Sequence, residues 1–393
     1  MGSGVKSGDH IDALTGIRGI AAWLVVLYHI RLSFAPSLPD WFVAAFAKGY
    51  LAVDLFFVLS GFVLWITWGQ RFAHEGLRAA LPFIRKRIAR VWPLHAVVLT
   101  ATVGFALVIA ATGRPLPTTY RWEELPLHYL LVQNWGFTSD LAWNDPSWSI
   151  STELAAYLLF PLAAVALAPA MRLGARLRVA CAVAATVAIA VALDRYFAAH
   201  GAALLGDSIA QLGLIRCLAL FACGMLMAIL WQASRTAALI AGVAALAFGL
   251  WWFVGARETL AAPLMFAALV PFVAVTSNLW RNPLASRLFV YLGEISYSTY
   301  LVHFLLWTLF KIAFVTDARD VPLALGTLYL ALTFVASVAL YRIVEVPARN
   351  WLSGTKPTTV RDDAEQYGHA TGLPPHDRLR RPGSAGHHAQ EGS

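Results

Sequence analysis

Residues Ala13–Ile30 read ALTGIRGIAAWLVVLYHI, an apolar run of membrane-spanning length that carries two ionisable side chains. A helix needs about 20 predominantly apolar residues to cross the hydrocarbon core of a bilayer. Runs of this kind recur about ten times along the chain. The sequence therefore predicts an all-α, polytopic transmembrane helical bundle. The expected spans are 13–30, 51–68, 93–111, 150–168, 179–193, 209–230, 237–254, 260–276, 295–315 and 323–341.

The composition supports a membrane protein. Hydrophobic residues make up 59% of the chain and charged residues 13%, whereas soluble domains are about a quarter charged. The first apolar run contains Arg18 and is not followed by a small-residue cleavage site, so we expect no cleavable signal peptide. Cys181, Cys217 and Cys223 lie in or beside apolar runs, without the spacing of a disulfide framework or a metal site.

Basic residues gather in alternate loops, around 71–90, 172–178 and 281–287. The positive-inside rule then places both termini in the cytoplasm. The net charge of +8 reflects this topology and contact with anionic lipids, and we expect no nucleic-acid role. The predicted domains are a cytoplasmic segment (1–12), the bundle (13–351) and a disordered cytoplasmic tail (352–393) rich in Gly, Pro, His, Arg and Ser.

Two ionisable residues of the first span face the same side of its helix. Arg18 and His29 are eleven residues apart, which is close to three turns and about 16.5 Å along the axis. A charge at the centre of a span costs roughly 2.5–3.5 kcal/mol, so each one needs a reason. His29 is a candidate general base, with a structural hydrogen-bonding role as the alternative. For Arg18 the alternative is an anchor at the membrane interface.

Two carboxylates lie toward the predicted outer ends of later spans. Asp54 stands at a depth similar to that of His29, where it would orient or charge-balance the imidazole, unless it faces a solvated vestibule. Glu153 falls about two turns into the fourth span, counted from Ser147. Together with His29 they suggest a polar cavity that opens to the outer face.

A basic run precedes the third span in what we expect to be a loop, Phe83–Pro93. Arg85, Lys86, Arg87 and Arg90 fall within it. Guanidinium groups bind phosphates through charge-assisted hydrogen bonds, so this run suits a nucleotide-bearing cofactor. Binding of lipid head groups is the competing interpretation.

Taken together, these motifs resemble the acyltransferase 3 family of bacterial membrane O-acyltransferases, in order and in spacing, from about residue 11 to residue 351. One departure is Ile150-Ser151-Thr152, where many relatives have Leu-Ser-Val or similar. The motifs are Arg18-x10-His29, Val53–Phe62, the basic run before Trp92-Pro93, Trp148-Ser149-x3-Glu153, Leu292–His303 and Val344–Arg349.

The resemblance implies transfer of an acyl group, often acetyl, from cytoplasmic acyl-CoA to a hydroxyl of a glycan or natural product such as a macrolide. The protein would then be a multi-pass protein of the bacterial cytoplasmic (inner) membrane. His29 would be the base, and Glu153 would support catalysis or acceptor binding. Arg18, Arg85, Arg87 and Arg90 would serve acyl-CoA, and Trp148, Ser149 and Ser151, with Thr152, would bind the acceptor or the oxyanion.

We expect direct transfer, because no motif pairs a Ser or Cys nucleophile with a base. The loop 112–148 carries Trp122, Tyr129, Trp135 and Trp143, which either hold a sugar ring or form an interfacial belt. The competing function is a proton-coupled secondary transporter, which buried ionisable residues also suit. Against it, the ionisable cluster has no mirror in the second half of the chain.

Overall fold

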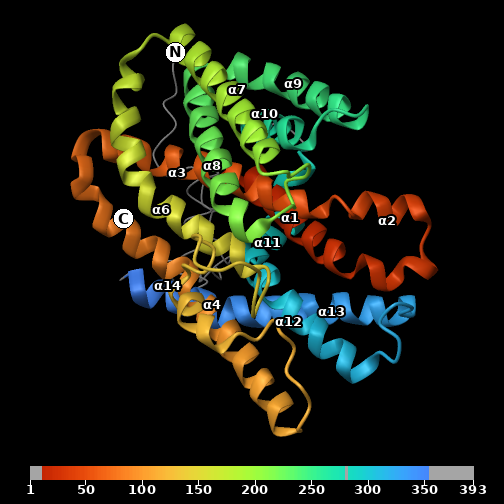
Figure 1. The fold of residues 1–393 in the computed structure, drawn as a ribbon. Coiled ribbons are helices and arrows are strands. Elements are labelled where there is room, and N and C mark those ends of the chain that lie inside the picture. The colour runs from red at the N-terminus through yellow and green to blue at the C-terminus, as the bar shows by residue number, and fades with distance from the viewer. Residues whose placement is uncertain (1–10, 279–281, 354–393) are drawn as a thin grey trace, which may run out of the picture. The chain divides into compact units, whose positions relative to one another are not determined.

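The computed structural model describes residues 11–278 and 282–353, and every regular element in these two ranges is helical (Figure 1). The all-α fold class predicted from the sequence is confirmed. The α-helices are α1 (Asp12–Ile30), α2 (Asp40–Phe46), α3 (Ala52–Glu75), α4 (Ala80–Ala111), α5 (Leu125–Leu130), α6 (Ser147–Leu167), α7 (Ala175–Ala199), α8 (Ile209–Ala233), α9 (Arg235–Phe253), α10 (Glu258–Thr276), α11 (Arg287–Glu294), α12 (Ser296–Phe314), α13 (Leu323–Leu340) and α14 (Val346–Ser353).

Each expected span coincides, within a few residues at most ends, with one long helix: α1, α3, α4, α6 to α10, α12 or α13. Within the described ranges, eight segments are long and apolar enough to cross a membrane, and one of these contains both α3 and α4. Helix α12 is not among them. Its first turns, Ser296–Tyr300, and His303 are polar or amphipathic, and the hydroxyl residues and the histidine among them are buried against the protein.

The basic run is helical, which corrects the expected loop. Helix α4 begins at Ala80, and Ala, Leu, Arg and Lys are good helix formers that carry it through to Pro93. Helical periodicity then divides the cations. Arg85 and Lys86 are exposed, whereas Arg87 and Arg90, about one turn apart, are half-buried.

Glycines allow a close crossing of α3 and α8. A Cβ atom on Gly61 of α3 would lie 2.0 Å from the carbonyl oxygen of Phe221 on α8. One on Gly224 of α8 would lie 2.1 Å from the carbonyl oxygen of Val58 on α3. Small residues let membrane helices approach until their backbones touch. This contact fixes α3 and α8 against each other.

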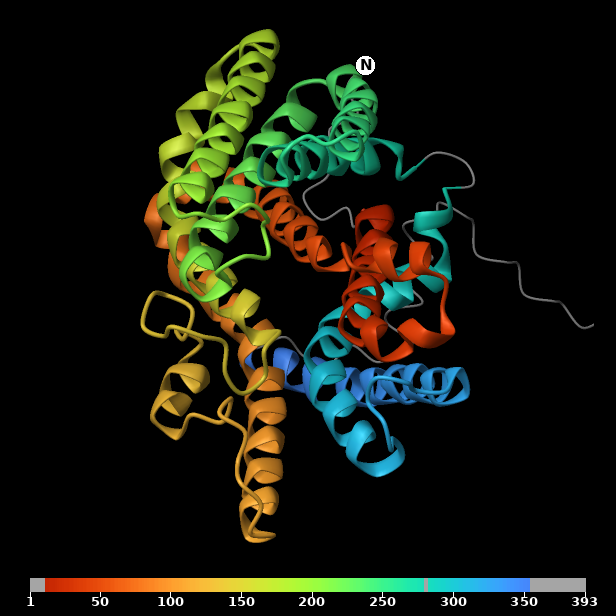
Figure 2. The ribbon, with the colours of Figure 1, turned by 45° about the vertical axis from the view of Figure 1, so that its right-hand side comes forward.

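Helix α1 joins two groups of helices. It packs against α3 and α10 on one side and against α11 and α12 on the other. In Figures 1 and 2 the red N-terminal helices lie between the green-to-teal helices α7 to α10 and the blue helices α12 and α13. A residue near the end of α1 can therefore meet side chains from both groups.

Both predicted terminal segments fall mostly outside the described residues. Of 1–12 only Ile11 and Asp12 are described, and of 352–393 only Leu352 and Ser353. Helix α14 continues to Ser353, two residues beyond the predicted end of the bundle. The cytoplasmic location of the termini stays a prediction.

Candidate active site

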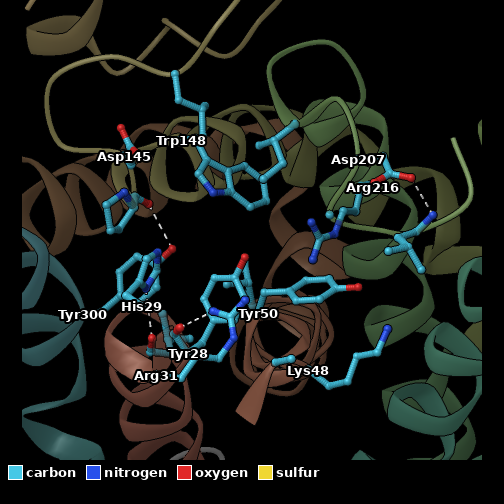
Figure 3. A pocket seen from close by; sticks show the side chains of 18 residues that line it. Tyr28, His29, Arg31, Lys48, Tyr50, Asp145, Trp148, Asp207, Arg216 and Tyr300 are labelled. Atoms are coloured by element: carbon cyan, nitrogen blue, oxygen red, sulfur yellow. Dashed lines mark hydrogen bonds between the residues drawn. The ribbon is translucent and has the colours of Figure 1, made fainter. Parts of the chain in front are cut away.

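A cavity of about 520 Å³ lies at one end of the bundle (Figure 3). It is bounded by the C-terminal end of α1, the N-terminal ends of α3, α6 and α8, and α12. These ends belong to the outer face in the topology predicted from the basic loops. The lining residues are Val25, Tyr28, His29, Arg31, Ala47, Lys48, Tyr50, Val53, Leu141, Asp145, Pro146, Trp148, Leu204, Gly206, Asp207, Ile209, Arg216 and Tyr300.

His29 lines this cavity with one ring nitrogen already engaged. Its Nδ1 lies 2.9 Å from the carbonyl oxygen of Val25, one turn earlier on α1. A carbonyl oxygen only accepts hydrogen bonds, so Nδ1 carries the proton of the neutral ring. Nε2 then holds a lone pair, and it has no hydrogen-bond partner among the described residues. His29 is thus arranged to accept a proton.

A second histidine fixes this tautomer. His303 of α12 is fully buried, and its Nδ1 lies 2.7 Å from the carbonyl oxygen of Tyr300. By the same reasoning its Nδ1 carries the proton and its Nε2 accepts. That Nε2 lies 3.2 Å from Nδ1 of His29. Both His303 and the Val25 carbonyl therefore hold the His29 proton on Nδ1.

Asp54 does not pair with His29, which corrects the expected partner. Its two carboxylate oxygens accept hydrogen bonds from Nε and Nη2 of Arg216 on α8, at 2.6 and 2.5 Å. Both side chains are buried. Arg216 faces the cavity and also lies over the ring of Trp148, 5.3 Å from its centroid. Asp54 thus holds a cavity-lining cation, and its own role in catalysis stays a prediction.

Glu153 lies away from the cavity lining, in a second polar cluster. Its Oε1 accepts a hydrogen bond of 2.6 Å from Tyr157 OH. Arg18 of α1 interacts electrostatically with Glu153 and with Glu345. Glu345 closes a π-helical turn, η7 (Tyr341–Glu345), and its Oε2 accepts from Ser298. Of the three ionisable groups expected in one outer cavity, only His29 lines it.

The candidate cofactor-binding arginines separate into two places. Arg87 and Arg90 of α4 are in the cluster with Glu153, where Arg90 also acts on Arg18. Arg87 Nε is buried without a hydrogen-bond partner among the described residues. Arg85 is exposed, and its Nε donates to the carbonyl oxygen of Leu352. Lys86, also exposed, lies near the ring of Trp68.

Of the predicted acceptor residues, only Trp148 lines the cavity. Ser149 Oγ lies 2.8 Å from Tyr300 OH, and both hydroxyls lie within reach of the Pro146 carbonyl oxygen, at 3.1 and 3.0 Å. Ser149 therefore positions Tyr300 at the cavity wall. Ser151 Oγ accepts from the backbone N–H of Asn134 and so supports the preceding loop. Thr152 donates to a backbone carbonyl within α6.

The aromatic residues of the long loop pack on the bundle and not around the cavity. Trp143 is buried beside Leu99 and Ala106 of α4, and Trp122 stacks edge-on against it. Trp135 Nε1 donates to the carbonyl oxygen of Ser151. The aromatic faces at the cavity come instead from Tyr28, Tyr50, Trp148 and Tyr300.

The loop between α7 and α8 is held to the cavity by two buried charges. The Leu205 N–H donates to Glu258 Oε1 over 3.0 Å, and its carbonyl oxygen accepts from Arg216 Nη1 over 2.8 Å. Glu258 also accepts from Lys48 Nζ, at 2.7 Å, and from Tyr50 OH. These contacts shape the wall formed by Leu204, Gly206 and Asp207.

Sequence reasoning missed three residues that define the site. Arg216 is a charge inside an apolar run, which by itself marks a functional or structural group. His303 ends one of the quoted motifs, and Asp145 begins the stretch before Trp148, and both positions were signals that pointed to the site. Asp145 is half-buried, and burial raises its pKa from 3.8 to about 6. In the described part of the chain, no group of three or more His, Cys, Asp or Glu residues is placed to hold a metal ion.

Comparison with known proteins gives matches over most of the chain. A family described as an acyltransferase domain matches residues 11–342. The chain is 31% identical over 381 residues to "Acyltransferase MdmB" of Streptomyces mycarofaciens, which covers 90% of this chain and 95% of that protein. No significant match to a solved structure was found.

Two further relatives match shorter stretches. "Protein 2 in picA locus" of Rhizobium radiobacter is 36% identical over 104 residues, covering 26% of this chain and 50% of that protein. "Putative peptidoglycan O-acetyltransferase YrhL" of Bacillus subtilis is 24% identical over 162 residues, covering 39% of this chain and 23% of that protein. The chain thus spans half or less of these two relatives.

Proposed function

This chain belongs to the acyltransferase family that matches residues 11–342, and from that premise we propose that it is an O-acyltransferase using cytoplasmic acyl-CoA, with acetyl as the expected group. The acceptor is a hydroxyl of a glycan or of a glycosylated natural product, and the location is the bacterial inner membrane. The observation that carries this proposal is the free, unprotonated Nε2 of His29 at a cavity lined by aromatic and polar side chains.

The proposed reaction is a direct transfer. His29 Nε2 takes the proton of the acceptor hydroxyl while the hydroxyl oxygen bonds to the thioester carbonyl carbon. The bond from that carbon to sulfur then breaks, and the proton passes to the departing CoA thiolate. The products are an acyl ester and free CoA. His303 and the Val25 carbonyl stabilise the imidazolium that forms between these two steps, although His303 offers a neutral acceptor and not a carboxylate.

The donor is proposed to approach from the opposite end of α1. Arg18 lies about 16.5 Å from His29 along the helix axis, among Arg87 and Arg90 in the second polar cluster. We propose that these three guanidinium groups and Arg85 hold acyl-CoA from the cytoplasmic side, with Glu153 keeping the cluster from carrying a large uncompensated charge. The reactive thioester would extend from there toward His29.

The alternative of a proton-coupled transporter loses its main support. Family membership accounts for buried ionisable residues in an enzyme. Moreover, Asp54 and Arg216 form a buried bidentate ion pair. While that pair is intact, the Asp54 carboxylate does not take up and release protons as a coupled transporter would require. No observation on the described residues favours transport over acyl transfer.

The test is acyl-CoA turnover by purified protein in nanodiscs, with release of free CoA as the readout. Wild type is expected to hydrolyse acetyl-CoA slowly without an acceptor, and His29→Ala is expected to lose this activity while still binding acetyl-CoA. His74→Ala is the matched control, because His74 is an exposed histidine at the far end of α3. If no acyl-CoA is bound or turned over by wild type, the donor assignment is wrong.

A further inference from the structure

One charged residue of the cavity lining is left without a partner. Asp145 belongs to the loop that leads into α6, and its carboxylate forms no hydrogen bond or ion pair with any residue in the described ranges. Only its backbone carbonyl is engaged, accepting from the N–H of Trp148. Figure 3 shows Asp145 at the edge of the same space that His29, Tyr300 and Trp148 surround.

The other charged groups of this lining each have at least one partner, although Arg31 Nε is buried without one among the described residues. Lys48 pairs with Glu258, and Arg216 pairs with Asp54. Arg31 donates to the Tyr28 carbonyl oxygen and lies over the Tyr28 ring. Asp207 accepts two backbone N–H groups of its own loop, those of Ala203 and Leu204. Among the charged lining residues that the structure describes, Asp145 thus retains its full capacity to accept hydrogen bonds.

A half-buried carboxylate without donors is unfavourable in the free protein. Removing a charged acceptor from water costs free energy unless hydrogen bonds replace the lost hydration. The same burial raises the pKa of Asp145 to about 6, which still leaves the group ionised near neutral pH. A ligand that brings hydrogen-bond donors to the cavity would remove this cost.

Asp145 is also tied to the candidate base through a short series of contacts. The carbonyl oxygen of the next residue, Pro146, accepts from Tyr300 OH over 3.0 Å. The carbonyl oxygen of Tyr300 accepts from His303, whose Nε2 faces His29 Nδ1. A ligand held by Asp145 is therefore positioned by the same framework that orients His29.

We propose that Asp145 recognises the acceptor, accepting hydrogen bonds from two neighbouring hydroxyl groups of a sugar ring and so presenting another hydroxyl of that ring to His29. A carboxylate has two oxygens that together accept a pair of donors, and vicinal hydroxyls supply such a pair. The aromatic side chains of Trp148 and Tyr50 line the same cavity, and aromatic rings suit the apolar face of a sugar. This assignment rests on the proposed acyltransferase function and adds the class of acceptor and its recognition residue.

The experiment uses the full chain in nanodiscs with acetyl-CoA and the methyl glycosides of glucose, mannose, galactose and rhamnose as acceptor probes. With the glycoside that wild type acetylates fastest, Asp145→Asn is expected to raise the acceptor KM about 10- to 100-fold, because hydrogen bonds to a charged acceptor are lost. Acceptor-independent hydrolysis of acetyl-CoA, measured in parallel, is expected to fall much less than transfer does, and a monodisperse size-exclusion profile shows that the variant is folded.

Asp140→Asn is the matched control. Asp140 lies in the same loop but is exposed and paired with Arg121, so its KM should equal that of wild type. An unchanged acceptor KM in Asp145→Asn overturns the proposal, and so does an equal loss of hydrolysis and transfer. If wild type hydrolyses acetyl-CoA through His29 but acetylates no glycoside, the sugar class is wrong while the proposed acyltransferase chemistry stands. If there is no hydrolysis either, the proposed function itself fails.

Discussion

At the residue scale, the site depends on how few hydrogen-bonding options its side chains keep. His29 has one nitrogen bound by a carbonyl oxygen and by His303, and the other free. Tyr300 shares its hydroxyl between Ser149 and Pro146. Each of these contacts restricts the orientation of a side chain. Together they leave the lone pair of His29 Nε2 available at the cavity. Preorganised groups of this kind act without first having to reorient.

His303 is expected to set the orientation of His29 without contacting the substrate. His303→Ala should lower kcat roughly 10- to 100-fold, as losses of orienting partners commonly do, and leave the KM for acetyl-CoA unchanged. His303→Gln should recover part of the loss, because its amide oxygen can accept from His29 Nδ1. Steady-state kinetics on both variants checks this. Equal kcat values for the two, or an effect on KM alone, would contradict a positioning role.

The carboxyl group of Asp145 is expected to give acceptor binding a pH dependence. Burial raises its pKa from 3.8 to about 6. Between pH 3.8 and pH 6 the Asp145 carboxyl group is therefore protonated in the folded protein and ionised in the unfolded chain. This group therefore stabilises the fold at low pH, and that contribution disappears as the pH rises through about 6. The titratable and charged groups that line the cavity with it are Tyr28, His29, Arg31, Lys48, Tyr50, Asp207, Arg216 and Tyr300, and Tyr120 interacts with it electrostatically.

Above pH 6 the ionised carboxylate accepts two hydrogen bonds from the acceptor, so the acceptor KM should fall as the pH rises from 5 to 7. The measurement is the KM of the preferred glycoside at half-unit pH steps, with kcat determined separately so that effects on the chemical step are kept apart from acceptor binding. In Asp145→Asn the KM should be flat with pH. A KM step of the same size in this variant would assign the pH dependence to another group.

At the scale of elements, the crossing of α3 and α8 brings Asp54 and Arg216 together beside the cavity. Asp54 and Arg216 lie near the N-terminal ends of these two helices, and their bidentate contact needs the helices in register. The glycines farther along each helix allow the backbones to touch. The backbone contact between the two helices thus helps to position Arg216, and with it the Trp148 ring, nearer the N-terminal ends of these helices.

Gly61→Ala is expected to destabilise the protein, because its Cβ atom would meet the Phe221 carbonyl oxygen at 2.0 Å. Overpacking of this kind costs roughly 1–3 kcal/mol or more. The measurement is the thermal midpoint of the detergent-solubilised protein followed by size-exclusion chromatography. Gly104→Ala on α4 is the control, since no atom lies within 4 Å of the place where its Cβ atom would stand, and it should match or exceed wild type. Equal midpoints for both variants would show that the crossing is loose.

Long apolar runs made the helices predictable from the sequence. The polar contacts between the helices could not be predicted in this way. The spans follow from hydrophobicity and length alone, so α1, α6 and α8 to α10 begin and end within three residues of their expected bounds, whereas α3 and α7 end seven and six residues later than expected. Which side chains meet depends on how each helix is rotated about its axis and how it crosses its neighbours. These two properties depend on residues far apart in the sequence and cannot be predicted from one segment. Depth along the helix suggested that Asp54 faces His29, whereas rotation directs Asp54 to Arg216 and His303 to His29.

At the scale of the whole molecule, the two polar regions lie toward opposite ends of the bundle. The cavity with His29 is built from helix ends that the positive-inside rule assigns to the outer face. Arg18, Arg87 and Glu345 belong to the cluster toward the other end. If acyl-CoA stays in the cytoplasm, the acyl group is handed to the acceptor across much of the membrane thickness, within a single active site.

This orientation is expected to appear in cysteine labelling of intact cells. Ser139→Cys lies in the exposed loop beside the cavity, and Gly174→Cys lies in the short connection before α7. A membrane-impermeant thiol reagent should label position 139 and not position 174 until the cells are opened. Wild type, with exposed Cys181 on α7 and buried Cys217 and Cys223, sets the background. The opposite labelling pattern would invert the topology and place the cavity in the cytoplasm.

The polar face of α12 also bears on how the chain is made. This helix is too polar to count among the membrane-crossing segments, yet it carries His303, and its backbone receives the Tyr329 hydroxyl of α13. A segment of this kind partitions poorly from the translocon into lipid by itself. Its buried serines, threonine and histidine lie against the protein, and α1 and α13 are the two helices with which α12 packs most extensively. We therefore expect α12 to enter the membrane together with α13, and a chain that still lacks these two helices would carry His29 without the histidine that orients it.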